Sequence, residues 1–437
     1  MRVWFLILFS LLLPLSALPQ YLPPTPENAP CTRLFPDVGD AFKVRVNMIV
    51  SAQKEVLMSY YYFEDAEKPF YILALLQQLR QRGVRVRMIV DGMTNKINES
   101  ALQYLEEHGL EVKVYNPTRF SRLLRLDRRM HDKFIIIDRK YLLVGGRNIS
   151  AKYFEGNLEK KGSFYDIDAF FEGTPAEEAA TYFDQRWESG WVELPHHKYK
   201  RFDPELFNDI QVKTLAEMAD NNVDTARARV DNYLKASCRD AHFMANDPYL
   251  TKRNRPVENA HIDLVNSAKK EILIQNGYIL FTSHMRRALK KALARGVRVE
   301  VIANSMQSVD IPLSYAAYLN VRHTYMDRGV KFYEFLHAQT MHSKIMVVDS
   351  AVAVVGSFNL DPRSAYRNSE TIVVVRDAPA VREVLDYFYL SRGFATEILP
   401  NRRPKGYDRK HPNTNLMRRL SVSALRYTVA PIIRSFL

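Results

Sequence analysis

The sequence has few of the residues that build metal sites or disulfide frameworks. Its only cysteines, Cys31 and Cys238, exclude a small scaffold held together by disulfides, although the two could pair in an oxidising compartment. No group of Cys and His has the spacing of a zinc site, and no acidic cluster predicts a magnesium or calcium site. We therefore expect a protein that works without a metal or another cofactor.

Long apolar runs are equally scarce. The one run, from Val3 to Leu13, follows Arg2 and precedes Pro14, a pattern typical of a secretory signal peptide. The run is shorter than the roughly twenty apolar residues of a full membrane span, so an uncleaved N-terminal anchor is the alternative. No other segment approaches that length, which excludes a polytopic membrane protein. We expect an exported protein, periplasmic or secreted, that is peripheral to the membrane.

Negative charge is in deficit. Lys and Arg exceed Asp and Glu by 62 − 49 = 13, which favours polyanionic partners, either phospholipid surfaces or nucleic acid. The tail 401–437 carries nine basic residues and the single acid Asp408, mixed with bulky apolar residues, which predicts an amphipathic tail that docks on anionic lipid. Five arginines between 119 and 129 favour the same surface, with a solvated basic helix as the alternative; they are Arg119, Arg122, Arg125, Arg128 and Arg129.

Against this background one pattern occurs twice. It consists of His-x-Lys, four apolar residues and Asp, at 131–138 and again at 342–349. Four consecutive apolar residues predict a strand buried on both faces, and side chains two positions apart share a face of a strand. His131 and Lys133 therefore point the same way, whereas Asp138 has the wrong parity and is expected in a turn, bonded to backbone. The corresponding residues of the second copy are His342, Lys344 and Asp349.

A second apolar run follows each copy and predicts a hairpin that ends in small residues and an Asn. The small residues let the backbone approach another group closely, and the Asn amide is a neutral hydrogen-bond donor. Ser357 is a possible further donor at a position where the first copy has Gly146. The residues of the two hairpin ends are Gly145, Gly146 and Asn148 in the first copy and Gly356, Ser357 and Asn359 in the second.

A neutral imidazole beside an ammonium and an amide is suited to attack on a phosphodiester. The imidazole attacks phosphorus, while Lys and Asn hold the oxygens on which charge develops. Two copies provide two imidazoles, so one can attack while the other protonates the leaving oxygen. One copy alone would be a chance match; two extended copies in equivalent places indicate a catalytic site.

The surrounding sequence is duplicated as well. Strand and helix patterns in the first half recur about 211 to 213 positions later, from Gly83 to Gly296 and from His131 to His342. We expect an α/β protein of two similar α/β/α sandwich halves with mixed sheets, related by a pseudo-twofold axis, with the active site at their interface. The expected segments are a signal peptide at 1–18, an N-terminal half at 31–195, a helical linker packing across both halves at 196–255, a C-terminal half at 256–400 and the basic tail at 401–437.

A carboxylate recurs beyond each hairpin. Aligning the Thr-Pro-Ala at 174–176 with the Ala-Pro-Ala at 378–380 places Asp166 opposite Glu370. Such carboxylates could hold the Nδ1 atom of each imidazole and stabilise the imidazolium. The alternative is a surface carboxylate at a strand edge.

These residues resemble the paired signature of the phospholipase D superfamily, and more specifically bacterial cardiolipin synthases without polytopic membrane helices. The resemblance implies a phosphatidyl-histidine intermediate, with His131 as nucleophile and His342 as general acid and then base, or the reverse. It also implies that the motif Lys and Asn residues bind the phosphoryl oxygens. The substrate would be a membrane phospholipid; water as acceptor gives phosphatidic acid, and a second phosphatidylglycerol gives cardiolipin. The catalytic unit would be a monomer.

Two other functions compete with this interpretation. A secreted nuclease of the same superfamily would use the same histidines, and the positive charge would serve a nucleic-acid backbone. A non-enzymatic lipid-binding protein would have a dead site, which two intact motifs argue against.

Overall fold

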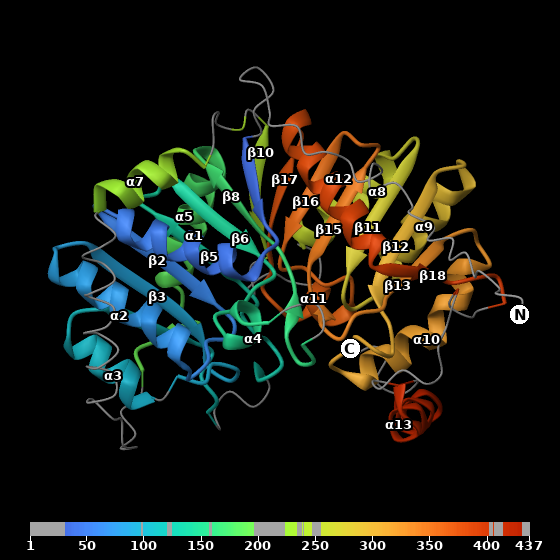
Figure 1. The fold of residues 1–437 in the computed structure, drawn as a ribbon, viewed down its shortest axis with the longest axis horizontal. Helices are drawn as coiled ribbons and strands as arrows, with labels where there is room; N and C mark the ends of the chain where they lie inside the picture. Colours follow the sequence, from blue (N-terminus) through green and yellow to red (C-terminus); the bar gives the residue numbers. More distant parts are fainter. Residues whose placement is uncertain are drawn as a thin grey trace, which may run out of the picture.

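The computed structural model contains two eight-stranded mixed sheets, each covered by helices and lying side by side (Figure 1). The expected signal peptide, Arg122 and most of the expected linker lie outside the described residues. The structure describes residues 31–97, 99–119, 125–156, 160–195, 223–233, 238, 240–246, 255–401, 405 and 414–430.

The first sheet is built around the strand of the first motif. Helices α1 (Val38–Ser51), α2 (Glu67–Gln81), α3 (Glu99–Glu107), α4 (Ala151–Phe154) and α5 (Thr174–Trp187) belong to this half. Its strands, in spatial order, are β1 (Thr32–Phe35), β8 (Asp168–Glu172), β6 (Tyr141–Gly145), β5 (Lys133–Ile137), β2 (Glu55–Tyr60), β3 (Arg85–Asp91), β4 (Glu111–Tyr115) and β9 (Val192–Glu193).

The second sheet has the same plan around the strand of the second motif. Its helices are α8 (Pro256–Ser267), α9 (Ser283–Ala294), α10 (Pro312–Met326), α11 (Pro362–Tyr366) and α12 (Ala378–Gly393). Its strands, in spatial order, are β10 (Ala241–Ala245), β17 (Thr371–Val375), β16 (Val352–Gly356), β15 (Lys344–Val348), β11 (Glu271–Asn276), β12 (Arg298–Asn304), β13 (Lys331–Phe335) and β18 (Ala395–Glu397).

The two sheets are equivalent strand by strand. In each, three neighbouring strands run parallel (β2, β3 and β4; β11, β12 and β13), and the remaining pairings are antiparallel. The motif strands β5 and β15 lie in the middle of the order and are buried along their whole length, which explains their uninterrupted apolar sequence. The predicted fold class, an internal duplication of an α/β unit with mixed sheets, is confirmed.

The expected helical linker needs correction. Strand β10 lies within 196–255, yet it pairs along its length with β17 and forms the edge of the second sheet. Helix α7 (Val223–Asp231) packs against α1 of the first half and does not bridge the two halves. The chain therefore enters the second sheet before residue 256, at β10.

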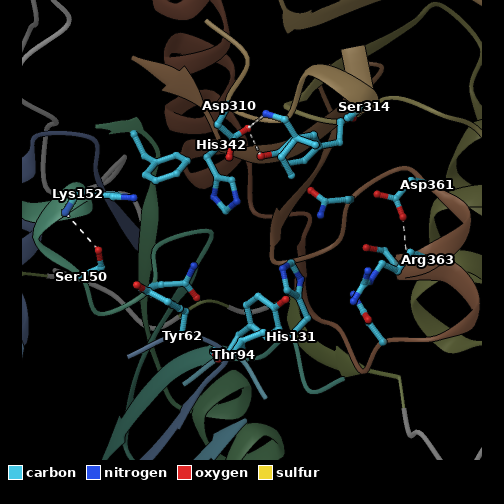
Figure 2. A pocket seen from close by; sticks show the side chains of 18 of the residues that line it. Tyr62, Thr94, His131, Ser150, Lys152, Asp310, Ser314, His342, Asp361 and Arg363 are labelled. Carbon is cyan, nitrogen blue, oxygen red and sulfur yellow. Dashed lines mark hydrogen bonds between the residues drawn. The ribbon is translucent and has the colours of Figure 1, made fainter. Parts of the chain in front are cut away.

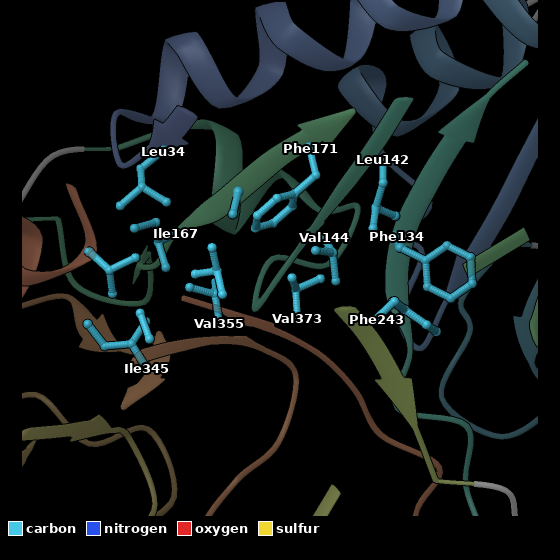
Figure 3. Packing of buried hydrophobic residues seen from close by; sticks show 14 of the residues in the cluster. Leu34, Phe134, Leu142, Val144, Ile167, Phe171, Phe243, Ile345, Val355 and Val373 are labelled. Atoms are coloured by element: carbon cyan, nitrogen blue, oxygen red, sulfur yellow. The ribbon is translucent and has the colours of Figure 1, made fainter. Parts of the chain in front are cut away.

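A shared apolar core joins the halves. Residues of both sheets and of helices α5 and α12 form one buried cluster, in which Phe134, Leu142 and Val144 of the first half lie near Val355 and Val373 of the second (Figure 3). A two-stranded parallel sheet also crosses the interface, between β7 (Phe164–Tyr165) and β14 (Thr340–Met341). The two halves are therefore packed into one unit, with the ends of both motif strands at the junction.

The two cysteines form a disulfide that fastens the start of the first half to the entry of the second. Cys31 and Cys238 are bonded, with their Cα atoms 4.7 Å apart and a sequence separation of 207. Cys31 immediately precedes β1, and Cys238 lies shortly before β10. The bridge thus holds together the edge strands of the two sheets.

Candidate active site

Both motif histidines face one pocket between the halves. His131 and His342 are buried and lie on opposite sides of a cavity of about 560 Å³ (Figure 2). Each histidine lies two positions before the first residue of its buried strand, so the sheet fixes the position of the histidine backbone. Asn148 and Asn359 line the same cavity.

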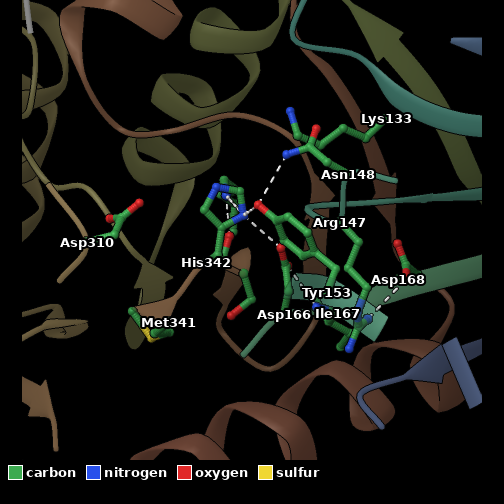
Figure 4. Close-up of polar contacts among 12 residues, drawn as sticks. Lys133, Arg147, Asn148, Tyr153, Asp166, Ile167, Asp168, Asp310, Met341 and His342 are labelled. Atoms are coloured by element: carbon green, nitrogen blue, oxygen red, sulfur yellow. Dashed lines mark hydrogen bonds and ion pairs between the residues drawn. The ribbon is translucent and has the colours of Figure 1, made fainter. Parts of the chain in front are cut away.

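The carboxylates hold the histidines crosswise. His131 Nδ1 lies 2.8 Å from Glu370 Oε2, and His342 Nδ1 lies 2.7 Å from Asp166 Oδ2, so each imidazole is held by a carboxylate from the other half (Figure 4 shows His342 and Asp166). The backbone sets up this exchange. The His131 N–H donates to Ser369 O at 3.0 Å, and the His342 N–H donates to Tyr165 O at 2.8 Å. In both cases the acceptor is the residue immediately before the carboxylate.

The two lysines share the face of their histidines, as the strand parity predicts. Lys133 Nζ donates to His131 O at 2.8 Å, and Lys344 Nζ donates to His342 O and lies 2.9 Å from His342 Nδ1. Both lysines are buried. Each ammonium therefore lies next to the imidazole of its own motif.

Burial and positive charge keep both histidines neutral. Burial, reinforced by the Lys133 ammonium, holds the pKa of His131 well below its usual value. Burial and the Lys344 ammonium lower the pKa of His342 to about 4. Burial also lowers the pKa of Lys133 to about 7 and that of Lys344 to about 8. At neutral pH the imidazoles in the site are thus unprotonated, whereas a large fraction of each lysine is still in the ammonium form.

The two carboxylates differ in their electrostatics. Burial raises the pKa of Glu370 to about 7, although the charge of Lys133 opposes this. Burial also acts to raise the pKa of Asp166, but the hydrogen bond from His342, together with the charges of Lys344 and Arg147, outweighs it and lowers the pKa. Asp166 is therefore the carboxylate that stays ionised, and it lies against His342.

The small residues of the hairpins make room for this arrangement. A Cβ atom on Gly146 would lie 2.2 Å from Asp166 Oδ1, so only glycine leaves space for that carboxylate. Ser357, at the corresponding position, donates its hydroxyl to Glu370 Oε2 at 2.6 Å. Its proton is thus engaged with the carboxylate and does not point at a phosphoryl group.

The preceding glycines permit close contact with the neighbouring strand. A Cβ atom would lie 2.3 Å from Ile167 O at Gly145 and 2.2 Å from Thr371 O at Gly356. Next to Gly146, Arg147 is buried and paired with Asp168 at 3.0 Å, away from the pocket (Figure 4). These residues hold the hairpin ends in place.

The motif aspartates end the strands. Asp138 and Asp349 adopt positive φ angles of 52° and 54°. Their carboxylates accept backbone hydrogen bonds from the start of the neighbouring strand, for example from Lys54 N at 2.7 Å and from Lys270 N at 2.7 Å. They lie at the opposite end of the motif strand from the histidines and do not line the pocket.

Sequence reasoning missed a second pair of supporting residues. Asp91 Oδ2 accepts from Met130 N at 3.1 Å, and Asn304 bonds both the N–H and the C=O of Met341, at 2.9 and 2.8 Å. Both residues end a parallel strand, β3 or β12, and are 213 positions apart, which is the repeat offset. Aligning the two halves and looking for polar residues at strand ends would have found them.

Tyrosines and charged residues complete the pocket. Tyr153 O–H lies 3.3 Å from His342 Nδ1 and accepts from Asn148 Nδ2 at 3.1 Å. Tyr278 donates to Asp310 Oδ1 at 2.6 Å. The further charged residues that line the cavity are Lys96, Lys152, Asp361 and Arg363. None of these belongs to the motif pattern, so the repeat alone did not single them out.

Three of the arginines between 119 and 129 make contacts within the protein. Arg129 is fully buried, with its Nε 3.2 Å from Asp91 Oδ2. Arg119 pairs with Glu193 at 2.5 Å, and Arg125 lies over the ring of Trp191. These three side chains stabilise the fold, and none of the described arginines of this stretch lines the pocket.

The fold and the site together define an enzyme of the phosphodiester-transfer class, with two His-Lys pairs contributed by two halves of one chain. Residues 46–187 and 261–390 match the family described as "Cardiolipin synthase, PLD-like domain". These segments make up more than half of the chain, so this protein belongs to that family and is an enzyme of the phospholipase D superfamily. The family expected from the two motifs is confirmed.

Three individual matches each cover most of this chain. Cardiolipin synthase C of Escherichia coli K12 is 26% identical over 391 residues, which cover 79% of this chain and 81% of the relative. An uncharacterized protein of Helicobacter pylori is 28% identical over 378 residues, covering 78% and 75%. The crystal structure of phosphatidylserine synthase from Haemophilus influenzae shares the fold, with a TM-score of 0.69 at 15% identity and coverage of 93% and 95%.

Two further observations concern the described part of the chain. None of its helices combines the length and the apolar character that crossing a bilayer requires. No set of three or more His, Cys, Asp or Glu side chains within it is arranged to hold a metal ion.

Proposed function

We propose that this enzyme transfers the phosphatidyl group of a membrane glycerophospholipid through a covalent phosphatidyl-histidine, as in cardiolipin synthesis. The observation that carries the proposal is the crossed pair of imidazoles at one pocket. Each has Nδ1 held by a carboxylate, which leaves Nε2 for the substrate. One imidazole can form the P–N bond while the other gives a proton to the departing headgroup oxygen.

The electrostatics favour His131 as the nucleophile. Its pKa lies well below the usual value, so it remains unprotonated and ready to attack. His342 lies against Asp166, whose lowered pKa keeps it ionised and therefore able to stabilise an imidazolium. In this assignment His342 takes up a proton when the anionic phosphodiester binds beside it, gives that proton from Nε2 to the leaving alcohol, and then takes the proton of the acceptor alcohol.

The phosphoryl oxygens need donors on both sides of the pocket. Lys133, Lys344, Asn148 and Asn359 are the motif residues placed beside the two imidazoles. The carbonyl oxygens of both asparagines lack a hydrogen-bond partner among the described residues. We assign the amide N–H groups and the ammonium groups to the oxygens on which charge develops during transfer.

The rest of the pocket suits a lipid with a second polar headgroup. Met93, Leu280, Ile311 and Ala317 supply apolar lining, whereas Lys96, Lys152 and Arg363 supply positive charge. An acceptor phosphatidylglycerol would bring both an apolar tail and a second phosphate. We therefore favour phosphatidylglycerol as acceptor, which gives cardiolipin, over water, which gives phosphatidic acid.

The proposal includes the setting of the enzyme. Both motifs come from one chain, so one chain completes the site and a monomer suffices. The disulfide between Cys31 and Cys238 favours an oxidising compartment, in line with export. The enzyme would act there as a peripheral protein on an anionic membrane. Its two halves would each be built on one of the two sheets described above.

The test is product analysis with purified enzyme on phosphatidylglycerol vesicles by mass spectrometry, with His131→Ala and His342→Ala as controls. Cardiolipin plus glycerol, lost in both variants, is the expected result. Phosphatidic acid plus glycerol would make the enzyme a hydrolase. No lipid product, together with digestion of single-stranded nucleic acid that both variants lose, would replace the lipid function by a nuclease.

A further inference from the structure

Helix α13 (Leu416–Tyr427) presents apolar side chains to solvent. Leu416, Met417, Leu420 and Tyr427 are 60, 71, 55 and 74% exposed. Residues 416, 420 and 427 are four and seven positions apart and therefore lie along one stripe of the helix. Val422, on the other side of the helix, is buried. An isolated protein in water gains nothing from such a stripe, so its presence indicates a partner for this face.

A basic pocket lies close to this helix. It is a cavity of about 340 Å³ between α9 and α10, and four cations line it: Arg286, Arg287, Lys290 and Arg328. No Asp or Glu is among its lining residues. Within the described part of the chain none of the four cations forms an ion pair. Four uncompensated cations around one cavity provide a site for a phosphate-bearing group.

Helix α10 connects the stripe, the basic pocket and the active site. Its Asn320 lines the basic pocket and exchanges two hydrogen bonds of 2.9 Å with Arg426 of α13. Ser314 and Ala317, on the preceding turns, line the catalytic pocket. From Ala317 to Thr324, which lines the basic pocket, the helix rises by roughly 10 Å.

Helix α13 is also fixed to the loop that borders the active site. Arg418 Nε donates to Met306 O at 2.9 Å, and the guanidinium also donates to Val309 O. Asp310 and Ile311, the next residues, line the catalytic pocket. Figure 1 shows α13 below α10 at the lower edge of the second half, with α4 and α11, which carry residues of the catalytic pocket, in the lower middle of the molecule. Helix α13, which carries the stripe, is therefore bonded to the segment that leads directly into the catalytic pocket.

We propose that the stripe of α13 and the basic pocket of α9 and α10 form one docking surface for a bilayer of anionic phospholipid. The stripe inserts among the acyl chains near the headgroups, and the basic pocket takes a lipid headgroup phosphate, so that the catalytic pocket opens onto the bilayer. The combination determines the partner. Nucleic acid has no use for the apolar stripe, and a second copy of this chain, with its net charge of +13, would bring like charge to the cations.

This surface extends the proposed lipid function, and both can be tested separately. The first measurement is flotation of the full chain with phosphatidylcholine vesicles, with and without phosphatidylglycerol. The triple variant Arg287→Gln, Lys290→Gln, Arg328→Gln should bind the anionic vesicles roughly a hundredfold more weakly. A matched triple variant of exposed cations in the first half, Lys43→Gln, Lys54→Gln, Arg82→Gln, should lose much less.

The apolar stripe has its own variant and control. Leu420→Asn should weaken vesicle binding roughly tenfold, because the side chain no longer enters the apolar layer. Leu390→Asn, on the exposed face of α12, should leave binding unchanged, since Leu390 is similarly exposed but lies outside this surface. Equal binding of the Leu420 and Leu390 variants would overturn the proposal, as would equal binding of wild type to neutral and anionic vesicles.

A soluble substrate separates docking from catalysis. On a short-chain, monomeric phosphatidyl-p-nitrophenol, the docking variants should release p-nitrophenol at the wild-type rate, because that substrate needs no bilayer. Loss of this activity together with vesicle binding would mean that the variants damage the active site, against the proposal. A wild-type protein that binds anionic vesicles through this surface, yet converts no lipid, would keep the docking surface and refute the proposed function.

Discussion

Replacing Asp166 by Asn removes one charge from the active site with almost no change of shape. In the structure this carboxylate lies 2.7 Å from His342 Nδ1, in a space that a Cβ on Gly146 would fill. A hydrogen bond to a charged group contributes about 1.5 to 3 kcal/mol, so losing the charge alone should slow turnover about 10- to 150-fold. The amide would also donate to Nδ1 and fix the wrong tautomer, and for a comparable His-carboxylate pair that change brings the loss to about 10⁴-fold.

The chromogenic substrate shows which step suffers. Because p-nitrophenol departs without protonation, His342 is not needed to form the covalent intermediate, but it is needed to activate the acceptor. Asp166→Asn should therefore retain a burst of one p-nitrophenol per enzyme and then turn over roughly 10⁴-fold more slowly than the wild-type enzyme. Glu370→Gln, the matched change at His131, should slow the burst itself.

Turnover of phosphatidylglycerol by Asp166→Asn at the wild-type rate would contradict this role of the carboxylate. Loss of the burst in this variant as complete as in His131→Ala would also contradict it, because Asp166 would then serve the nucleophile. Thermal unfolding of each variant checks that the fold is intact, as the near-identical shape of Asn and Asp predicts.

Three further predictions follow from the site and the fold. Burial lowers the pKa of Lys133 to about 7 and that of Lys344 to about 8. As pH rises through this range the ammonium groups lose their protons, so kcat/KM on the soluble substrate should fall. A profile that stays flat up to the ordinary lysine pKa of 10.5 would contradict this. Reduction of the disulfide, which closes a loop with a sequence separation of 207, should lower the free energy of unfolding by about 5 kcal/mol, measured as the difference between urea titrations without and with reductant. Equal free energies of unfolding would show that the bridge does not stabilise the protein. Gly146→Ala places a Cβ 2.2 Å from Asp166 Oδ1 and should reduce turnover at least about a hundredfold. The control Gly393→Ala, with no atom within 4 Å of its added Cβ, should leave turnover unchanged. Equal rates in the two variants would contradict the role of Gly146.

Local pattern was enough to predict the fold class. The apolar runs after His131 and His342 are strands because they are buried on both faces, and the repeat also matched β2 with β11, β3 with β12 and β6 with β16. Strand β10 was missed because His242 interrupts its apolar sequence, and its partner β17 follows some 130 positions later. No local pattern reports a pairing of that kind.

The sequence also predicted a carboxylate for each histidine, but not the exchange between halves. That exchange depends on the parallel contact of β7 with β14 and on the bridge between Met130 and Ser369, which are non-local. For the same reason Arg129 seemed to belong to a basic surface patch, while in the folded chain it is buried against Asp91. Chain neighbours reveal charge composition, and only the tertiary structure shows which charges face solvent.

The central claim is that His131 forms the bond to phosphorus. The most direct measurement mixes His342→Ala with the chromogenic phosphatidyl substrate, stops the reaction in alkaline denaturant because phosphorus–nitrogen bonds are labile to acid, and maps the peptides by mass spectrometry. We expect a phosphatidyl adduct on the peptide that contains His131, and none in His131→Ala. An adduct on His342 in the wild-type enzyme, or sustained turnover in which no adduct forms on either histidine, would contradict it.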